Sequence, residues 1–214
     1  DPSRIAGTLL SNGIVYIANP AGVYFAHGSL VNVGGIYAAA GKISNTDFLS
    51  GTNRFTNLQG VVENRGTISG DNVSLIGARV ANYGVINAPN GMVTMAAGGE
   101  VYVGEQNGSF FARASSQPAT TGGTGVTQAG QVEAKGGRVL ISAGDMYAMA
   151  IDHPGSTRAK QITVEGGRTG VVSVSGTLDA SNSASGGVGG TVKVLGEKVG
   201  IFGGTIDASG DAGG

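Results

Sequence analysis

The chain has 214 residues and a formal net charge of -1, and only 13% of its residues are charged. This composition offers neither a basic field for a phosphate backbone nor a strong acidic field, so nucleic acid is not an expected partner. Cysteine is absent, which excludes disulfides, thiolate metal sites and a thiol nucleophile. Glycine supplies 41 residues while 40% of the chain is hydrophobic, so the glycines must punctuate a packed structure.

Short runs that alternate apolar and polar residues follow one another along the chain. A period of two in β-branched residues predicts strands, and helical periodicity is nearly absent. The clearest runs are 73–75, 93–95, 139–141, 172–174, 192–194 and 199–201. We therefore expect an all-β chain.

Two degenerate repeats help to choose between β architectures. Residues 62–68 (Val-Glu-Asn-Arg-Gly-Thr-Ile) are echoed by 80–86 (Val-Ala-Asn-Tyr-Gly-Val-Ile), and 176–181 (Gly-Thr-Leu-Asp-Ala-Ser) by 204–209 (Gly-Thr-Ile-Asp-Ala-Ser). A variable period with Gly or Asn at corners predicts a coil whose rungs share one core. We expect a right-handed parallel β-helix, or solenoid, with extra-helical loop excursions; a sandwich and a propeller remain alternatives.

Two stretches interrupt the alternation. Residues 104–130 are rich in Gly, Ser, Thr and Gln, and we expect Phe110 and Phe111 there to pack back onto a face of the coil. Residues 145–161 are expected to form a longer loop or a strand pair. The predicted organisation is therefore rungs over 1–103, an excursion over 104–130 and further rungs over 131–214.

The first third of the chain carries the most specific signal. Residues 7–25 (Gly-Thr-Leu-Leu-Ser-Asn-Gly-Ile-Val-Tyr-Ile-Ala-Asn-Pro-Ala-Gly-Val-Tyr-Phe), 31–35 (Val-Asn-Val-Gly-Gly) and 47–51 (Asp-Phe-Leu-Ser-Gly) resemble the secretion domain of filamentous-haemagglutinin-type two-partner-secretion exoproteins. The later repeats resemble the rungs of the same family, so the resemblance covers nearly the whole chain.

One turn carries the resemblance most sharply. Asn19, Pro20, Ala21 and Gly22 stand where that family has Asn-Pro-Asn-Gly. Asn19 and Pro20 can begin a turn and Gly22 can close it. Ala21 departs from the family pattern, because it has no side-chain amide to bond its own backbone. We expect the turn to form all the same.

The resemblance implies a protein that passes through a dedicated outer-membrane transporter, folds outside the cell and remains at the cell surface. It implies an adhesin or filament segment that attaches to a glycan or protein of a host or bacterial surface. A purely structural shaft that stacks end to end is an alternative. Residues 1–4 lack the pattern of a signal peptide, so we expect the targeting segment outside this chain, and both ends resemble cuts in a longer protein. No apolar run reaches the roughly 18 to 20 residues of a membrane span.

Repeated polar residues are the candidate sites. Asn64 and Asn82 occupy equivalent positions, which predicts a structural amide ladder or a corner cap in preference to ligand binding. Asp179 and Asp207 repeat in the same way and are expected to cap turns, with cation or polysaccharide binding as the alternative. We expect neither a cofactor nor a metal.

The enzyme alternative is a β-helix that cleaves acidic polysaccharides with aligned titratable residues. Its candidates are Asp145, Asp152, His153, Arg158 and Lys160, which would have to converge in a groove. His153 lies in a pattern more typical of a loop than of an oriented base. The motifs of serine hydrolases, zinc proteases and phosphate-binding loops are absent. We therefore expect no catalytic residue.

Overall fold

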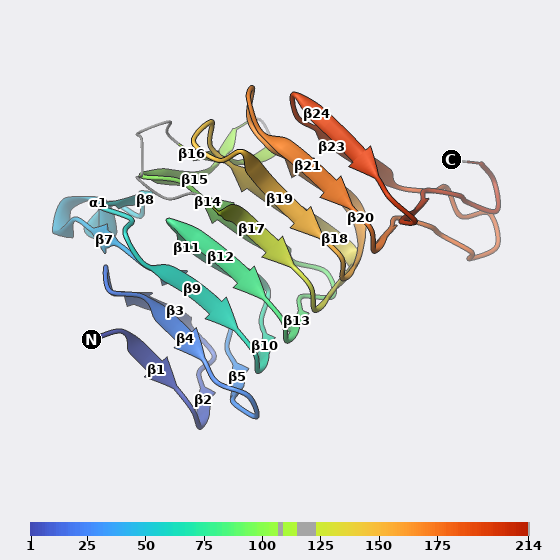
Figure 1. Cartoon of the computed structure of the whole chain (residues 1–214). Coiled ribbons are helices and arrows are strands. Elements are labelled where there is room, and N and C mark those ends of the chain that lie inside the picture. The colour runs from blue at the N-terminus through green and yellow to red at the C-terminus, as the bar shows by residue number, and fades with distance from the viewer. Residues whose placement is uncertain (107–108, 115–122, 214) are drawn as a thin grey trace.

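The structure, a computed structural model, describes residues 1–106, 109–114 and 123–213, without the side chains of 105, 106, 109–111 and 113. The strands are stacked in successive parallel turns of a coil that runs from the N-terminus to the C-terminus (Figure 1). The chain is thus a parallel β-helix, as its repeats predict. Within the described residues, no helix is long and apolar enough to span a membrane.

Each full rung of the coil contributes to three faces, which we name A, B and C. Face A contains, in spatial order, β1 (Ser3–Ile5), β4 (Val23–Phe25), β9 (Val61–Asn64), β12 (Arg79–Asn82), β17 (Thr124–Gln128), β19 (Met149–His153), β21 (Val171–Val174) and β24 (Lys198–Ile201). We number the rungs 1 to 8 by these strands.

Faces B and C are joined in one hydrogen-bonded sheet, because two long strands continue through the corner between them. These strands are β18 (Gln131–Ala143) and β20 (Ser156–Glu165). Face B also contains β2 (Thr8–Leu10), β5 (Leu30–Asn32), β10 (Thr67–Ser69), β13 (Val85–Asn87), β22 (Thr177–Asp179) and β25 (Thr205–Asp207). Face C also contains β3 (Ile14–Ala18), β6 (Gly35–Ala39), β11 (Asn72–Gly77), β14 (Met92–Ala97) and β23 (Thr191–Leu195).

The sequence repeats are neighbouring rungs in register. Val62 pairs with Val80, and Ile68 pairs with Ile86. In the second repeat Leu178 pairs with Ile206. Like residues therefore stack directly above one another along the axis of the coil.

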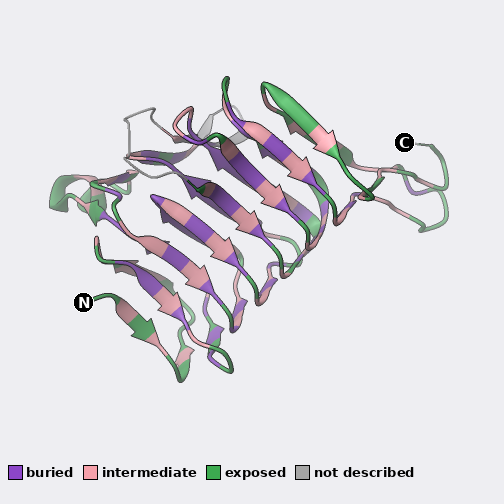
Figure 2. Cartoon of the chain, viewed as in Figure 1, coloured by how far each residue is buried: buried purple, intermediate pink, exposed green. Residues whose placement is uncertain are grey.

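The inward side chains form one continuous hydrophobic core along the axis. On face A, buried residues alternate with residues that are partly exposed along strands such as β9, β12 and β21 (Figure 2). On face B one core column contains Val31, Ile68, Ile86, Val132 and Leu178. Each fully buried aliphatic side chain of this kind stabilises the fold by about 1.5–3 kcal/mol.

Glycine recurs at the corner between faces A and B because neighbouring rungs approach each other closely there. A Cβ atom on Gly84 would lie 2.2 Å from the carbonyl oxygen of Gly66, and one on Gly130 would lie 2.1 Å from that of Gly84. The same column continues through Gly155 and Gly176. A larger residue at these positions would push two rungs apart.

A second sheet covers part of the outer surface of face C. It contains β7 (Lys42–Ile43), β8 (Asn53–Thr56), β15 (Val101–Gln106) and β16 (Ser109–Ala114), and a short helix α1 (Asn45–Leu49) precedes β8. These strands are antiparallel and enclose a separate hydrophobic cluster that includes Tyr37, Phe55 and Ile76. This extra-helical sheet comes from two excursions, of which the sequence predicts only the later one.

The strands modify two expectations about the irregular stretches. The coil resumes with β17, so the later excursion ends before residue 130, and β15 begins before residue 104. Phe110 and Phe111 belong to β16, but their side chains lie outside the described ones. The stretch 145–161 is neither a long loop nor a strand pair, because β19 and the start of β20 lie on different faces of rung 6.

Candidate functional site

The turn from Asn19 to Gly22 leads from face C of rung 1 to face A of rung 2. The backbone N–H of Ala21 donates to Oδ1 of Asn19 at 3.0 Å, and that of Gly22 donates to the carbonyl oxygen of Asn19 at 2.9 Å. Asn19 therefore closes the turn through both its side chain and its backbone. The turn forms although Ala21 has no amide.

The same turn is tied to the first residues of the chain and to rung 3. Nδ2 of Asn19 donates to the carbonyl oxygen of Asp1 at 3.0 Å and to Oγ of Ser3 at 3.1 Å. Gly22 has φ +125°, and a Cβ atom there would lie 3.0 Å from the carbonyl oxygen of Val61. The turn is thus built into the packing of three rungs, while Ala21 is exposed.

A line of amide side chains is buried at the corner between faces A and B. Nδ2 of Asn64 donates to Oδ1 of Asn82 at 2.8 Å, and Nδ2 of Asn82 donates to Oε1 of Gln128 at 2.8 Å. Gln128 completes the line by donating to the carbonyl oxygens of Gly130 and Ser156. These bonds satisfy side-chain groups that would be costly to bury alone.

Sequence reasoning missed Gln128, because the composition of residues 104–130 indicated an excursion. A spacing signal was nevertheless present. Asn64 precedes Gly66 by the same interval as Asn82 precedes Gly84 and Gln128 precedes Gly130. We call Asn64, Asn82 and Gln128 the amide ladder.

His153 continues the column of the amide ladder in rung 6. It is fully buried in β19, and its Nε2 lies 2.8 Å from Oγ1 of Thr157, while Nδ1 has no hydrogen-bond partner among the described residues. Burial lowers the pKa of His153 to about 4, because the charged imidazolium would lose its hydration. The residue is part of the core and not of a loop.

The five candidates for an enzyme do not converge. Asp152 lies on face A, Arg158 lies on face B, and Lys160 lies at the corner between faces B and C. Asp145 lies after β18, where the backbone N–H of Arg168 donates to Oδ1 and Nε of Arg168 donates to Oδ2 at 3.0 Å.

The bonds from Arg168 lower the pKa of Asp145, the backbone N–H having the largest effect. Asp145 is therefore a carboxylate held in an ion pair and suits neither a general acid nor a neutral-pH base. Within the part of the chain that the structure describes, no three His, Asp or Glu side chains gather as a metal site would require.

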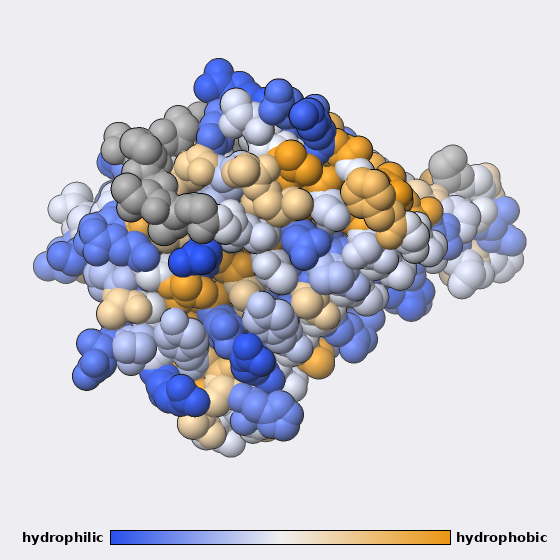
Figure 3. Space-filling model, viewed as in Figure 1, coloured by the Kyte–Doolittle hydropathy of each residue, from blue (hydrophilic) through white to orange (hydrophobic). Residues whose placement is uncertain are grey.

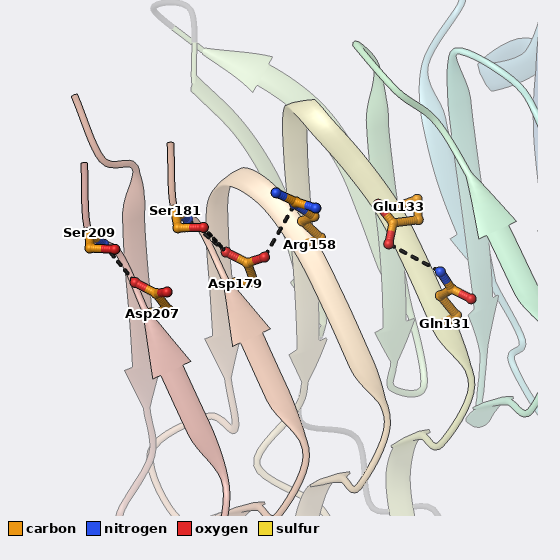
Figure 4. Close-up of polar contacts among 7 residues, drawn as sticks. All are labelled: Gln131, Glu133, Arg158, Asp179, Ser181, Asp207 and Ser209. Atoms are coloured by element: carbon orange, nitrogen blue, oxygen red, sulfur yellow. Dashed lines mark hydrogen bonds and ion pairs between the residues drawn. The ribbon is translucent and has the colours of Figure 1, made fainter. Parts of the chain in front are cut away.

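Asp179 and Asp207 stack on the outer side of face B in rungs 7 and 8 (Figure 4). Oδ1 of Asp179 accepts from the backbone N–H and hydroxyl of Ser181, and Oδ1 of Asp207 accepts from the backbone N–H of Ser209 at 2.8 Å. Oδ2 of Asp179 also lies 3.2 Å from Nε of Arg158. The geometry is that of two turn caps, one of which is also in an ion pair.

Comparisons with known proteins agree with this architecture. The family model of the TPS secretion domain matches residues 1–200. The heme/hemopexin-binding protein of Haemophilus influenzae is 38% identical over an alignment of 109 residues, and the match covers 45% of this chain and 12% of that protein. The HMW1 secretion domain of Haemophilus influenzae superposes with a TM-score of 0.69 at 22% identity, covering 92% of this chain and 54% of that chain. The chain thus spans a small part of the curated relative and about half of the solved structure.

Proposed function

Because the chain belongs to the TPS secretion domain family, we propose that it directs export of its exoprotein through an outer-membrane transporter and that the exported protein serves attachment. The match over residues 1–200 is the observation that carries the export role. The transporter is the expected partner, and the outer side of the outer membrane is the expected location.

The turn at Asn19 supports a role in recognition by the transporter. It combines the turn chemistry of the family motif with an exposed third residue, Ala21, and lies at a corner of the coil. A corner is accessible in a way that the core columns are not. We assign Asn19, Pro20 and Gly22 to this element.

The stacked rungs support attachment over catalysis. A continuous core makes the coil a stiff carrier, and the titratable candidates for an enzyme lie on separate faces. The curated relative is named for binding of heme and hemopexin. Capture of a host ligand is therefore the second candidate function of the exported protein.

Secretion of the whole exoprotein, expressed with and without its transporter, tests the export role. We expect release into the medium only with the transporter, and reduced release for Asn19→Ala. Asn12→Ala is the matched control, because Asn12 is exposed in the same segment but lies outside the turn. Ala21→Asn restores the family motif and should be released at least as well as the wild type. Release that does not depend on the transporter would contradict the proposal.

A further inference from the structure

Three hollows join into one groove that crosses the corner between faces B and C. The corner hollow of about 420 Å³ shares Asn90, Gly136 and Lys160 with a middle hollow of about 680 Å³. The middle hollow shares Arg138 and Gln161 with a third, of about 710 Å³, on the outer side of face C. The groove therefore suits an extended chain better than a single small ion.

Unequal corners of neighbouring rungs create this groove. Ala134 pairs with Ala159 and Arg138 pairs with Gln161, so residues 135–137 of rung 5 stand opposite Lys160 alone in rung 6. On the other side, rung 7 leaves the coil between β22 and β23. The short corner of rung 6 is consequently recessed between two longer ones.

The corner hollow is basic. Lys135 and Lys160 line it, and no Asp or Glu is among the described residues of its lining. Glu133, which accepts from Nε2 of Gln131 at 3.1 Å, and Asp179, which pairs with Arg158, lie outside the lining of this hollow (Figure 4). The two ammonium groups thus have no carboxylate partner within the hollow.

The other two hollows carry both signs of charge, with more basic than acidic groups. Arg138 and Lys193 line the third hollow together with Arg168, which is paired with Asp145. Glu165 lines the third hollow, and Asp71 lines the middle one. Gln161 and Asn90 add amide groups that can both donate and accept hydrogen bonds.

We propose that this groove binds an acidic polysaccharide. Its carboxylate or sulfate groups pair with Lys135 and Lys160 in the corner hollow, and its hydroxyls bond to Asn90 and Gln161. The inference rests on the proposed role in attachment and names the class of ligand. Because both lysines are exposed, each ionic contact is weak and salt reduces the binding affinity. Tight attachment therefore requires that many copies of the protein on one surface bind the polysaccharide together.

Fluorescence polarisation of labelled polygalacturonate oligosaccharides with the full chain tests the proposal. The double variant Lys135→Gln/Lys160→Gln should bind about tenfold more weakly, which corresponds to about 1.4 kcal/mol. Lys42→Gln/Lys198→Gln is the matched control, because it removes the same charge from exposed positions outside the groove. This control should bind within about twofold of the wild type, and neutral dextran should not bind.

Three results would overturn the proposal: equal weakening by both double variants, no binding of the acidic oligosaccharides, or equally tight binding of single-stranded DNA. The last result would indicate a general polyanion surface. Thermal unfolding of both variants confirms that they fold. Transporter-dependent release of Lys135→Gln/Lys160→Gln is measured in parallel, so a failure of glycan binding is distinguishable from a failure of export.

Discussion

Asn64 donates a hydrogen bond to Asn82 at 2.8 Å inside the coil, where both side chains are 0% exposed. Asn82 is the central member of the amide ladder, since it accepts from Asn64 and donates to Gln128. A buried amide network stabilises a fold only when its members are satisfied. The ladder therefore also opposes a slip of register between rungs 3, 4 and 5.

Removal of the central amide should be costly. Asn82→Leu keeps the number and branching of the side-chain heavy atoms but leaves Oε1 of Gln128 without a donor and Nδ2 of Asn64 without its acceptor at position 82. We expect the free energy of unfolding to fall by about 2–4 kcal/mol, as measured by urea denaturation. Asn32→Leu, at an exposed position of β5, is the control and should change the free energy of unfolding by less than about 0.5 kcal/mol. Equal stability of both variants would show that the amide ladder does not stabilise the fold.

The buried histidine makes stability depend on pH. The pKa of His153 is about 4 in the folded protein, below its ordinary value of 6.5. Between these values the unfolded chain binds a proton that the folded chain does not, so stability falls as pH falls from about 6.5 to about 4. The loss reaches on the order of 3 kcal/mol once the pH is below about 4, where the folded chain also binds the proton.

His153→Gln should abolish this part of the pH dependence, because glutamine does not titrate. The free energy of unfolding is measured at pH 7 and pH 4.5 for the wild type, His153→Gln and the exposed-site control His27→Gln. Carboxylates titrate in every variant, so the difference between variants isolates the histidine. A pH dependence unchanged by His153→Gln would place its origin elsewhere.

The register of the coil could be predicted from sequence because the repeats preserve inward positions. Val62 and Val80 stack as their repeat predicts, as do Leu178 and Ile206. His153 was misread as a loop residue because it lies between Asp152 and Pro154 in the sequence. Its position follows the inward alternation of β19 and the spacing to the next corner glycine, which the amide ladder shares. The alternation of buried positions therefore indicates the location of His153 better than its sequence neighbours do.

The extra-helical sheet could not be predicted in the same way. β8 pairs with β15 across a long interval of sequence, and neither strand repeats a rung pattern. Their pairing depends on burying the outer side of face C, where Tyr37 and Ile76 join a cluster with Phe55. Local alternation reports that a strand has an apolar side, but not which distant segment covers it.

Gly22 should be the least replaceable residue of the candidate secretion turn. Its φ of +125° is rarely adopted by a residue with a side chain, and a Cβ atom there would lie 3.0 Å from the carbonyl oxygen of Val61 and 3.1 Å from a ring carbon of Tyr24. We expect Gly22→Ala to destabilise the chain by about 1–3 kcal/mol in urea denaturation. Gly7→Ala is the control, because a Cβ atom at Gly7 meets no atom within 4 Å. Similar stability of the two variants would show that the turn relaxes without cost.

The ion pair between Asp145 and Arg168 should stabilise the fold, and we expect Asp145 to have no catalytic role. Asp145→Asn weakens charged bonds from Arg168 and should lower the free energy of unfolding by about 1 kcal/mol, because solvent around the exposed Arg168 screens the ion pair. The control is Asp152→Asn, at a half-buried position on face A, which should lower the free energy of unfolding by less than about 0.5 kcal/mol.

The enzyme alternative has its own test. Acidic polysaccharides incubated with the wild type should keep their chain length. Shortening that Asp152→Asn abolishes would instead establish an enzyme.

The last rung gives a test of the filament alternative. Ile201 continues a core column above Val174, yet it is 51% exposed because no described rung covers β24, and hydrophobic side chains gather over this strand (Figure 3). An open strand edge with uncovered apolar groups favours pairing with another chain.

We expect the chain of residues 1–214 to self-associate with rising concentration in sedimentation velocity, and Ile201→Lys to reduce this. Val188→Lys is the control, because Val188 is also exposed, at 65%, but lies outside the rung strands. Elongated oligomers that depend on Ile201 but not on Val188 would show that the uncovered edge of β24 pairs with another copy of this chain. A monomer at all concentrations, or equal effects of Ile201→Lys and Val188→Lys, would contradict this expectation.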